Sequence, residues 1–271
     1  MTAINQKIAN LPDDQKREIL DLLDELEEAK SKEESRTDFL TFVNKMWPSF
    51  IAGKHHTIMA DAFERVAKGE LKRLIVNMPP RHTKSEFASY LFPAWFLGKY
   101  PEKKIIQTAH TAELAVGFGR KVRNLINQED FQGVFPGISL SSDSKAAGRW
   151  NTNKRGDYFA IGVGGAVTGK GADVLIIDDP HSEQEAALGA YNPEVYDKVY
   201  EWYTSGPRQR LQPGGSIIIV MTRWSTRDLT GKIIKSVTQK EGVDDWEVIE
   251  LPAIMPSGDP LWPEFWPLEQ L

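Results

Sequence analysis

The sequence contains no cysteine in its 271 residues, which excludes disulfides, thiolate metal ligands and cysteine nucleophiles. It also contains no apolar run near 18 residues, so no membrane-spanning helix is predicted. The first residues lack the apolar centre of a secretory signal. With 41% hydrophobic and 26% charged residues, the composition is that of an ordinary globular protein. We therefore expect an intracellular protein with one large α/β domain or two small ones.

Most of the chain also lacks an excess of charge of either sign. The net charge is -5, and the first 35 residues, with 5 basic and 10 acidic residues, account for all of it. Residues 13–30 place Ile19, Leu22, Leu23 and Leu26 on one face of a predicted acidic helix. Two interpretations stay open: a solvated helix that packs on the main domain, or a helix that docks on a partner protein.

Beyond this acidic helix, "SKEESR" at 31–36 is typical of a short linker. We therefore predict an acidic N-terminal helical segment over 1–35 and one domain over 36–271. No internal repeat or low-complexity segment interrupts the second part.

Apolar runs alternate with helical patterns through the rest of the chain. Because the strands are almost continuously apolar, they indicate an α/β fold with a mostly parallel central sheet, covered by helices on both faces. Ligands of such sheets bind beyond the carboxyl ends of the strands. Strands are predicted over 73–78, 104–109, 158–163, 173–179, 216–222 and 246–251. Helices are predicted over 85–100 (interrupted by Pro93), 111–127, 192–206 and 226–237.

Two segments resemble the phosphate-binding pattern G-x-x-x-x-G-K-[ST], and each departs from it. "GGAVTGKG" at 164–171 has the glycines and Lys170 but ends in Gly171. "MPPRHTKS" at 78–85 has the Lys-Ser pair but neither glycine. Only 78–85 follows a strand and opens a helix, the arrangement that points backbone N–H groups at an anion. We therefore expect 78–85 to bind phosphate.

The phosphate-binding pattern predicts roles for Lys84 and Ser85, the last two residues of this segment. Lys84 would reach the terminal phosphates of ATP, and the Ser85 hydroxyl would ligate Mg²⁺. Thr83 stands where the pattern has Gly. A positive φ there would be an outlier for a β-branched residue, so the loop takes another geometry or tolerates strain.

Two further strands end in polar residues. "VLIIDDP" at 174–180 ends in two carboxylates. We expect Asp178 to support Mg²⁺ and Asp179 to orient the attacking water, with Glu183 as the alternative to Asp179. "IIIVMTRW" at 217–224 ends in Thr222 and Arg223, which would sense the γ-phosphate.

Over residues 38 to 271 the sequence resembles the ATPase part of phage large terminase subunits, the motors that package DNA. The strings that carry the resemblance are "LIVNMPPRHTKSE", "GVGGAVTGKGADVLIIDDP", "RLQPGGSIIIVMTRW" and "LWPEFWP". The family usually has Gly in place of Thr83. The resemblance implies a P-loop NTPase fold with additional strands, and it adds Pro80, Arg81 and His82 to the loop residues that contact the nucleotide.

The resemblance also implies partners and a place of action. We expect ATP and Mg²⁺ as ligands, and a homo-oligomeric ring, with a monomer as the isolated form. The ring would drive double-stranded DNA into a procapsid, together with the portal protein and the small terminase subunit. The expected location is the host cell cytoplasm, at the portal vertex, and no membrane is involved. Family members usually carry a C-terminal nuclease domain. This chain stops before one could form, so no DNA cleavage is expected.

Several basic side chains have open roles. Lys170 is a candidate for a cation that reaches the nucleotide of a neighbouring subunit, and Arg81 is the competing candidate within its own subunit. His55 and His56 either contact the base or cap a helix, whereas His82 and His110 lack the spacing of a metal site. Four cations of 144–158 would track DNA phosphates or lie in a solvated loop: Lys145, Arg149, Lys154 and Arg155.

Two other functions remain open. A helicase-type nucleic-acid ATPase shares the phosphate loop and the Asp-ending strand, but 271 residues show no second motor core. A nucleotide-binding assembly subunit with weak hydrolysis is the other alternative, which Thr83 supports.

Overall fold

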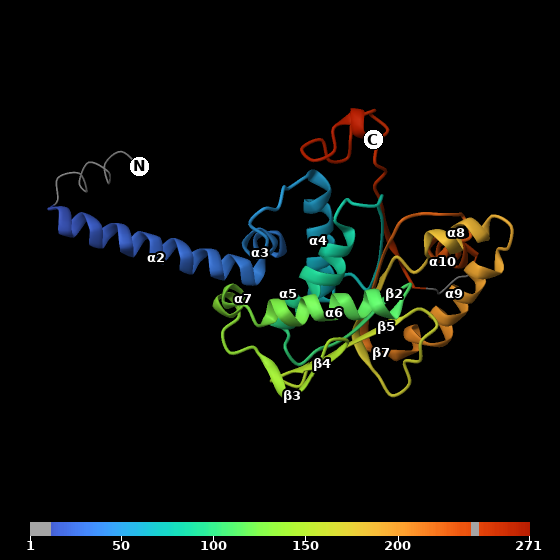
Figure 1. Ribbon diagram of the computed structural model, residues 1–271, viewed down its shortest axis with the longest axis horizontal. Coiled ribbons are helices and arrows are strands. Elements are labelled where there is room, and N and C mark those ends of the chain that lie inside the picture. The colour runs from blue at the N-terminus through green and yellow to red at the C-terminus, as the bar shows by residue number, and fades with distance from the viewer. Residues whose placement is uncertain (1–11, 240–243) are drawn as a thin grey trace.

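The computed structural model describes residues 12–239 and 244–271, apart from the side chains of 143–145. Its centre is an eight-stranded sheet in the order β3-β4-β5-β2-β6-β7-β1-β8 (Figure 1). The six strands from β5 to β8 are parallel, and β3 and β4 extend the β5 edge as an antiparallel pair. The bounds are β1 (Arg73–Asn77), β2 (Lys104–Ala109), β3 (Leu140–Ala146), β4 (Arg149–Thr152), β5 (Asp157–Gly162), β6 (Ala172–Asp178), β7 (Leu211–Met221) and β8 (Glu247–Glu250).

Helices cover both faces of this sheet, as the sequence predicts. Neighbouring residues of a strand face opposite sides, so Val76 packs in one apolar cluster and Ile75 in the other. The first cluster includes residues of α3 (Phe39–Met46), α4 (Lys54–Lys68), the π-helix η1 (Glu86–Leu91), α5 (Phe92–Lys99), α6 (Ala112–Ile126) and α7 (Glu129–Val134). The second includes residues of α9 (Glu194–Ser205) and α10 (Leu229–Gln239), and α8 (Glu183–Gly189) contacts α9. Two short 3₁₀ helices, η2 (Pro207–Arg210) and η3 (Leu268–Gln270), complete the elements.

The helix expected over 85–100 consists of two helices of different type. The π-helix η1 ends at Leu91, and the Phe92 N–H still donates to the carbonyl of Phe87, five residues back. Pro93 then lies in the first turn of α5, where its missing N–H leaves no helical bond unmade and its fixed φ suits the helix. The predicted interruption at Pro93 is therefore a change from π to α geometry.

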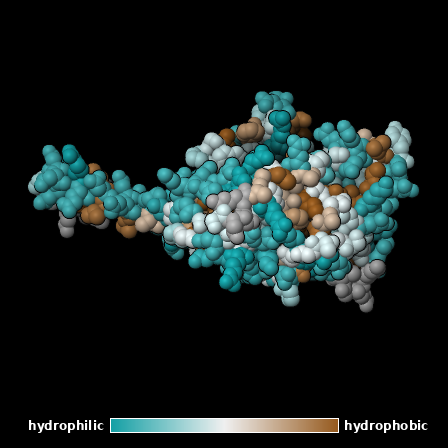
Figure 2. All heavy atoms as spheres, turned by 60° about the horizontal axis from the view of Figure 1, so that its bottom comes forward, coloured by the Kyte–Doolittle hydropathy of each residue, from teal (hydrophilic) through white to brown (hydrophobic). Residues whose placement is uncertain are grey.

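The acidic helix is longer and more isolated than expected. Helix α2 (Asp13–Thr37) runs without a break through 31–36, so the prediction of a linker there is wrong. Most of α2 projects from the body of the protein (Figure 1), and Leu22, Leu23 and Leu26 are 57%, 42% and 64% exposed. Figure 2 shows apolar atoms along this arm among hydrophilic ones. The interpretation of a solvated helix that packs on the main domain therefore holds for the C-terminal part of α2, which contacts α3 and α7, and docking on a partner stays a prediction.

Only the C-terminal end of α2 contacts the domain. The side chain of Ser35 is fully buried, and its carbonyl accepts a hydrogen bond from Trp95 Nε1 at 3.0 Å. The guanidinium of Arg36 donates to the carbonyl of Val134. In the described part of the chain, no helix has both the length and the apolar character that crossing a bilayer requires.

Candidate functional site

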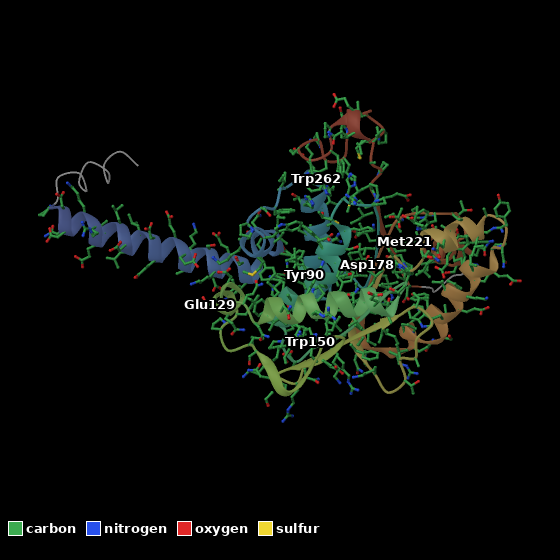
Figure 3. All side chains as sticks on the ribbon, viewed as in Figure 1. Tyr90, Glu129, Trp150, Asp178, Met221 and Trp262 are labelled. Carbon is green, nitrogen blue, oxygen red and sulfur yellow. The ribbon has the colours of Figure 1, made fainter. Side chains whose placement is uncertain are left out.

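The strand order brings three of the predicted motifs to one edge of the sheet. Strand β7 lies between β1 and β6, and all three are parallel. Met221 pairs with Asn77, and Val220 pairs with Asp178, so the carboxyl ends of the strands lie next to each other. Figure 3 shows Asp178 and Met221 close together at this edge. The segments that follow these strands therefore converge in space.

The segment 78–85 links β1 to the helix η1 and has an unusual backbone. Arg81 has φ 60° and Thr83 has φ 67°, so both non-glycine residues adopt the left-handed conformation. Within the described residues, the backbone N–H groups of 81–83 donate to no partner. Consecutive free N–H groups before a helix form a concave site for an anion. Of the two alternatives for Thr83, another loop geometry or tolerated strain, the structure shows the second.

The side chain of Lys84 lies at the centre of the site. It is 5% exposed, and its ammonium is 2.9 Å from Asp179 Oδ2 and 3.2 Å from Thr222 Oγ1. Asp179 itself has φ 38°, and its Oδ1 accepts from the N–H of Thr222 at 2.8 Å. The structure thus brings together predicted residues from β1, β6 and β7.

The second carboxylate, Asp178, is buried at 2% exposure and accepts two hydroxyl hydrogen bonds. Ser85 Oγ donates to Oδ1 at 2.8 Å and Ser89 Oγ donates to Oδ2 at 2.6 Å. Gln107 Nε2 in turn donates to Ser89 Oγ at 2.9 Å. Burial first, and then the charge of Asp179, raise the pKa of Asp178 to about 7. A cation at Ser85 and Asp178 would therefore displace a proton in neutral solution.

Sequence reasoning missed Ser89 and Gln107. Ser89 lies four residues after Ser85, about one turn further along the helix, and this spacing was the available signal. Gln107 lies on β2, and only the pairing of β2 with β6 brings it to the site.

A cavity of about 520 Å³ opens beside Asp179. Its lining includes Glu183, so Asp179 and its alternative face the same space. The lining also includes His110, His181 and Trp224, none of which was predicted there. His110 directly follows the carboxyl end of β2. The rule that ligands bind beyond the carboxyl ends of parallel strands would therefore have found it.

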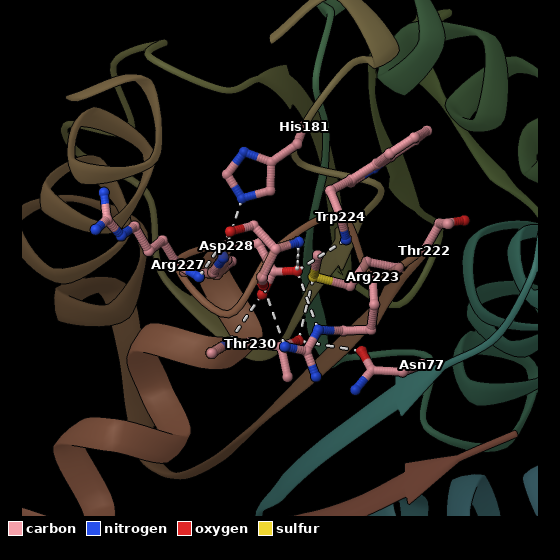
Figure 4. A network of polar contacts seen from close by, with 12 residues as sticks. Asn77, His181, Thr222, Arg223, Trp224, Arg227, Asp228 and Thr230 are labelled. Carbon is pink, nitrogen blue, oxygen red and sulfur yellow. Dashed lines mark hydrogen bonds and ion pairs between the residues drawn. The ribbon is translucent and has the colours of Figure 1, made fainter. Parts of the chain in front are cut away.

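The predicted phosphate sensor Arg223 has a partner of its own. Its Nε donates to Asp228 Oδ2 at 3.0 Å (Figure 4). Asp228 is fully buried and also accepts from the N–H groups of Trp224 and Gly231. This network fixes the turn after β7 to the first turn of α10. Thr222 is thus brought to Lys84, whereas Arg223 binds Asp228.

Lys170 is not brought to the other site residues. Its ammonium is 2.8 Å from Asp157 Oδ2 and 5.1 Å from the centroid of the Phe159 ring. Asp157 begins β5, and Lys170 lies just before β6, so both are at the amino edge of the sheet. The seven residues of β6 span roughly 20 Å between this edge and Asp178. The segment 164–171 lies between β5 and β6, with no helix after it.

The other basic candidates are in different environments. Arg81 is exposed, and His56 Nδ1 accepts from the Gly53 N–H at 2.8 Å, which caps α4. The expectation of capping is therefore confirmed for His56, and base contact stays a prediction. DNA contact by the 144–158 cluster is also untested: Arg149, Lys154 and Arg155 are exposed, and the side chain of Lys145 lies outside the described residues.

The comparisons with known proteins show a likeness in structure but none in sequence families. No protein-family model matches the chain, and a search of curated proteins returns no match. Among solved structures, the chain is similar to the large terminase of bacteriophage HK97, with a TM-score of 0.47 and 13% sequence identity. The likeness covers 75% of this chain and 40% of the terminase, so the chain spans well under half of that protein's length.

We expect Asp178→Asn to change how stability depends on pH in metal-free buffer. The pKa of this carboxyl is about 7 in the folded protein and about 3.9 in an unfolded chain. The stability that this proton contributes is therefore complete below about pH 4 and is lost as the pH rises through about 7. Thermal unfolding with EDTA should show the wild type losing stability relative to Asp178→Asn between about pH 4 and 7. A constant or rising difference would contradict the raised pKa.

Proposed function

We propose that this chain is an ATP-hydrolysing motor domain that translocates double-stranded DNA during viral genome packaging. The observation that carries the ATPase part is the position of Lys84. Lys84 lies at the end of a strand-to-helix loop that has free N–H groups. Its ammonium is 2.9 Å from the carboxylate of Asp179, which directly follows β6. The packaging part rests on the sequence resemblance over 38 to 271.

The loop 78–85 fits the phosphates of a nucleotide. The free N–H groups of 81–83 and the ammonium of Lys84 supply positive charge on one side of the loop, and an anion there would satisfy all of them. Lys84 would exchange its contact with Asp179 for the phosphates. Charge that develops on the transferred phosphoryl group would then lie beside a buried cation, where electrostatic stabilisation is strong.

Ser85 and Asp178 fit Mg²⁺. Their oxygens are 2.8 Å apart, and hydroxyl and carboxylate oxygens are the ligands that this ion prefers. Mg²⁺ bound there would offset negative charge on the phosphates. Ser89, the second hydrogen-bond donor to Asp178, would keep the carboxylate oriented.

We assign the orientation of the attacking water to Asp179, with Glu183 as the alternative. Both carboxylates line the cavity beside the loop. Asp179 Oδ1 is fixed by the N–H of Thr222, whereas Glu183 is exposed at the start of α8. A fixed carboxylate holds a water in one place at lower entropic cost, which favours Asp179.

The assembled form would supply the remaining groups. In a ring, Lys170 of one subunit would face the nucleotide of its neighbour, and Arg81 would act within its own subunit. We place this ring in the host cell cytoplasm at the portal vertex, with the portal protein, the small terminase subunit and DNA as partners. Thr83 favours a second candidate, an assembly subunit with weak hydrolysis, because strain in the loop opposes nucleotide binding.

Lys84→Ala should lower ATP turnover by about 10²–10³-fold, because no other buried cation contacts the loop among the described residues and such groups contribute this much to rate. Phosphate release and circular dichroism are measured together. Lys72→Ala is the matched control, since Lys72 is exposed at the opposite edge and donates to the Gly214 carbonyl. Turnover that survives in a folded Lys84→Ala would overturn the assignment of the loop.

Asp178→Ala should abolish Mg²⁺-dependent turnover, whereas Asp179→Asn should slow the chemical step and leave nucleotide binding in place. The difference follows from the two environments: Asp178 contacts Ser85, and Asp179 lines the cavity. Single-turnover kinetics and binding of a non-hydrolysable ATP analogue separate the two effects. If Glu183→Gln stops turnover and Asp179→Asn does not, the water-orienting role belongs to Glu183.

Mixing two inactive variants tests Lys170 under conditions that assemble the ring. Lys170→Ala lacks the trans cation and Asp178→Ala lacks the metal site, so each alone should be inactive. In the mixture, a Lys170→Ala site receives Lys170 from an Asp178→Ala neighbour, and activity should partly return. A mixture that assembles but stays inactive, or an active Lys170→Ala protein, would favour Arg81.

A further inference from the structure

Three carbonyl groups of the loop 78–85 accept hydrogen bonds from side chains. His82 Nδ1 donates to the carbonyl of Pro80 at 2.9 Å. Trp266 Nε1, from the C-terminal segment, donates to the carbonyl of Arg81 at 3.3 Å. Thr83 Oγ1 donates to the carbonyl of His82 at 2.6 Å. These carbonyls accept from side chains and not from the N–H groups of 81–83, so these N–H groups stay free for a ligand.

The hydroxyl of Thr83 is the link between this loop and His56. The Gly53 N–H donates to His56 Nδ1 at 2.8 Å, so the neutral ring carries its proton on Nε2. Nε2 is 2.7 Å from Thr83 Oγ1 and therefore donates to it. One chain of hydrogen bonds thus runs from Gly53 through His56 and Thr83 to the carbonyl of His82.

The ring of His56 is held on several sides. It is fully buried, and its centroid is 4.6 Å from the ring of Phe50, 5.0 Å from Phe87 and 5.0 Å from Trp262. Burial, followed by the neighbouring His55, lowers the pKa of His56 to about 3, so the ring stays neutral and keeps this hydrogen-bond pattern near neutral pH. A ring packed in this way can fix the position of the hydroxyl that it contacts.

We propose that His56 is a positioning residue for the loop 78–85. It holds Thr83 in the left-handed conformation, which a glycine would adopt without such a contact. The proposal rests on the proposed function, because it concerns the loop that would bind ATP. At φ 67° a threonine is strained by its β-branch, and the hydrogen bonds through its hydroxyl offset this strain. His56 acts through Thr83, 27 residues away in the sequence.

Substitutions at Thr83 separate the hydroxyl from the backbone. Thr83→Val keeps the β-branch and removes the hydroxyl, Thr83→Ser keeps the hydroxyl, and Thr83→Gly removes the strain that the hydroxyl offsets. The affinity for Mg²⁺ with a non-hydrolysable ATP analogue is measured by calorimetry. We expect Thr83→Val to bind the analogue about tenfold more weakly than the wild type, because the hydrogen bonds through the hydroxyl, which offset the backbone strain, are lost. Thr83→Ser should bind more tightly than Thr83→Val.

The decisive comparison combines His56→Ala with Thr83→Gly. In the wild-type background His56→Ala should weaken binding by about tenfold, and in the Thr83→Gly background by less than about twofold, because a glycine needs no external restraint. A purely structural role would weaken binding equally in both backgrounds and would overturn the proposal. If His56→Ala does not fold, Thr83→Val, which leaves His56 in place, decides by itself: affinity equal to that of Thr83→Ser overturns the proposal.

Thermal unfolding without nucleotide keeps this proposal distinct from the proposed function. The loss of stability from His56→Ala should be smaller in the Thr83→Gly background than in the wild type, whether or not the protein binds ATP. A wild type that binds no nucleotide, together with this coupling, would refute the proposed function and leave the contact between His56 and Thr83 established. Absence of the coupling would refute the contact itself.

Discussion

The ion pair between Lys84 and Asp179 is the interaction on which the rest of the site depends. The ammonium of Lys84 is 5% exposed, and a buried charge without a partner is strongly destabilising. Asp179 supplies the partner at 2.9 Å, and Thr222, which follows β7, contacts both residues. The N–H of Thr222 fixes one oxygen of Asp179, and its hydroxyl accepts from Lys84. The position of β7 between β1 and β6 thus brings a third residue to the ion pair formed by the segments that follow β1 and β6.

Backbone strain is concentrated at the same place. Of the four non-glycine residues with positive φ in the part of the chain that the structure describes, Arg81, Thr83 and Asp179 belong to the site. Such residues persist only where their surroundings hold them. Arg81 is held through its carbonyl by Trp266, Thr83 by His56, and Asp179 by Thr222. In the loop 78–85, left-handed residues that are not glycine are thus accompanied by contacts from segments distant in sequence.

The sequence predicted the parts of the structure that depend on local pattern. Continuous apolar runs predicted six strands of the sheet, and the order strand, loop, helix selected 78–85 over 164–171. The place of Thr83 in the pattern raised the question of a left-handed conformation, and the structure answered it. Gln107 was not predictable in this way, because it reaches the site only through the pairing of β2 with β6 and has no local signal of its own. His110 could have been found, because it directly follows the carboxyl end of a predicted strand. The continuous helix through 31–36 was missed because polar, charged residues are typical of both linkers and solvated helices.

The site is joined to α10 by two contacts of different origin. On the β6 side, His181 Nε2 accepts from the N–H of Leu229 at 3.0 Å. On the β7 side, Arg223 binds Asp228, whose carboxylate also caps the first turn of α10 through the Gly231 N–H. Both contacts reach the same turn of α10, from residues within two positions of Asp179 or Thr222. Because Asp179 and Thr222 are also bonded to each other, the carboxyl ends of β6 and β7 and the start of α10 form one connected unit, and Lys84 contacts this unit through both residues.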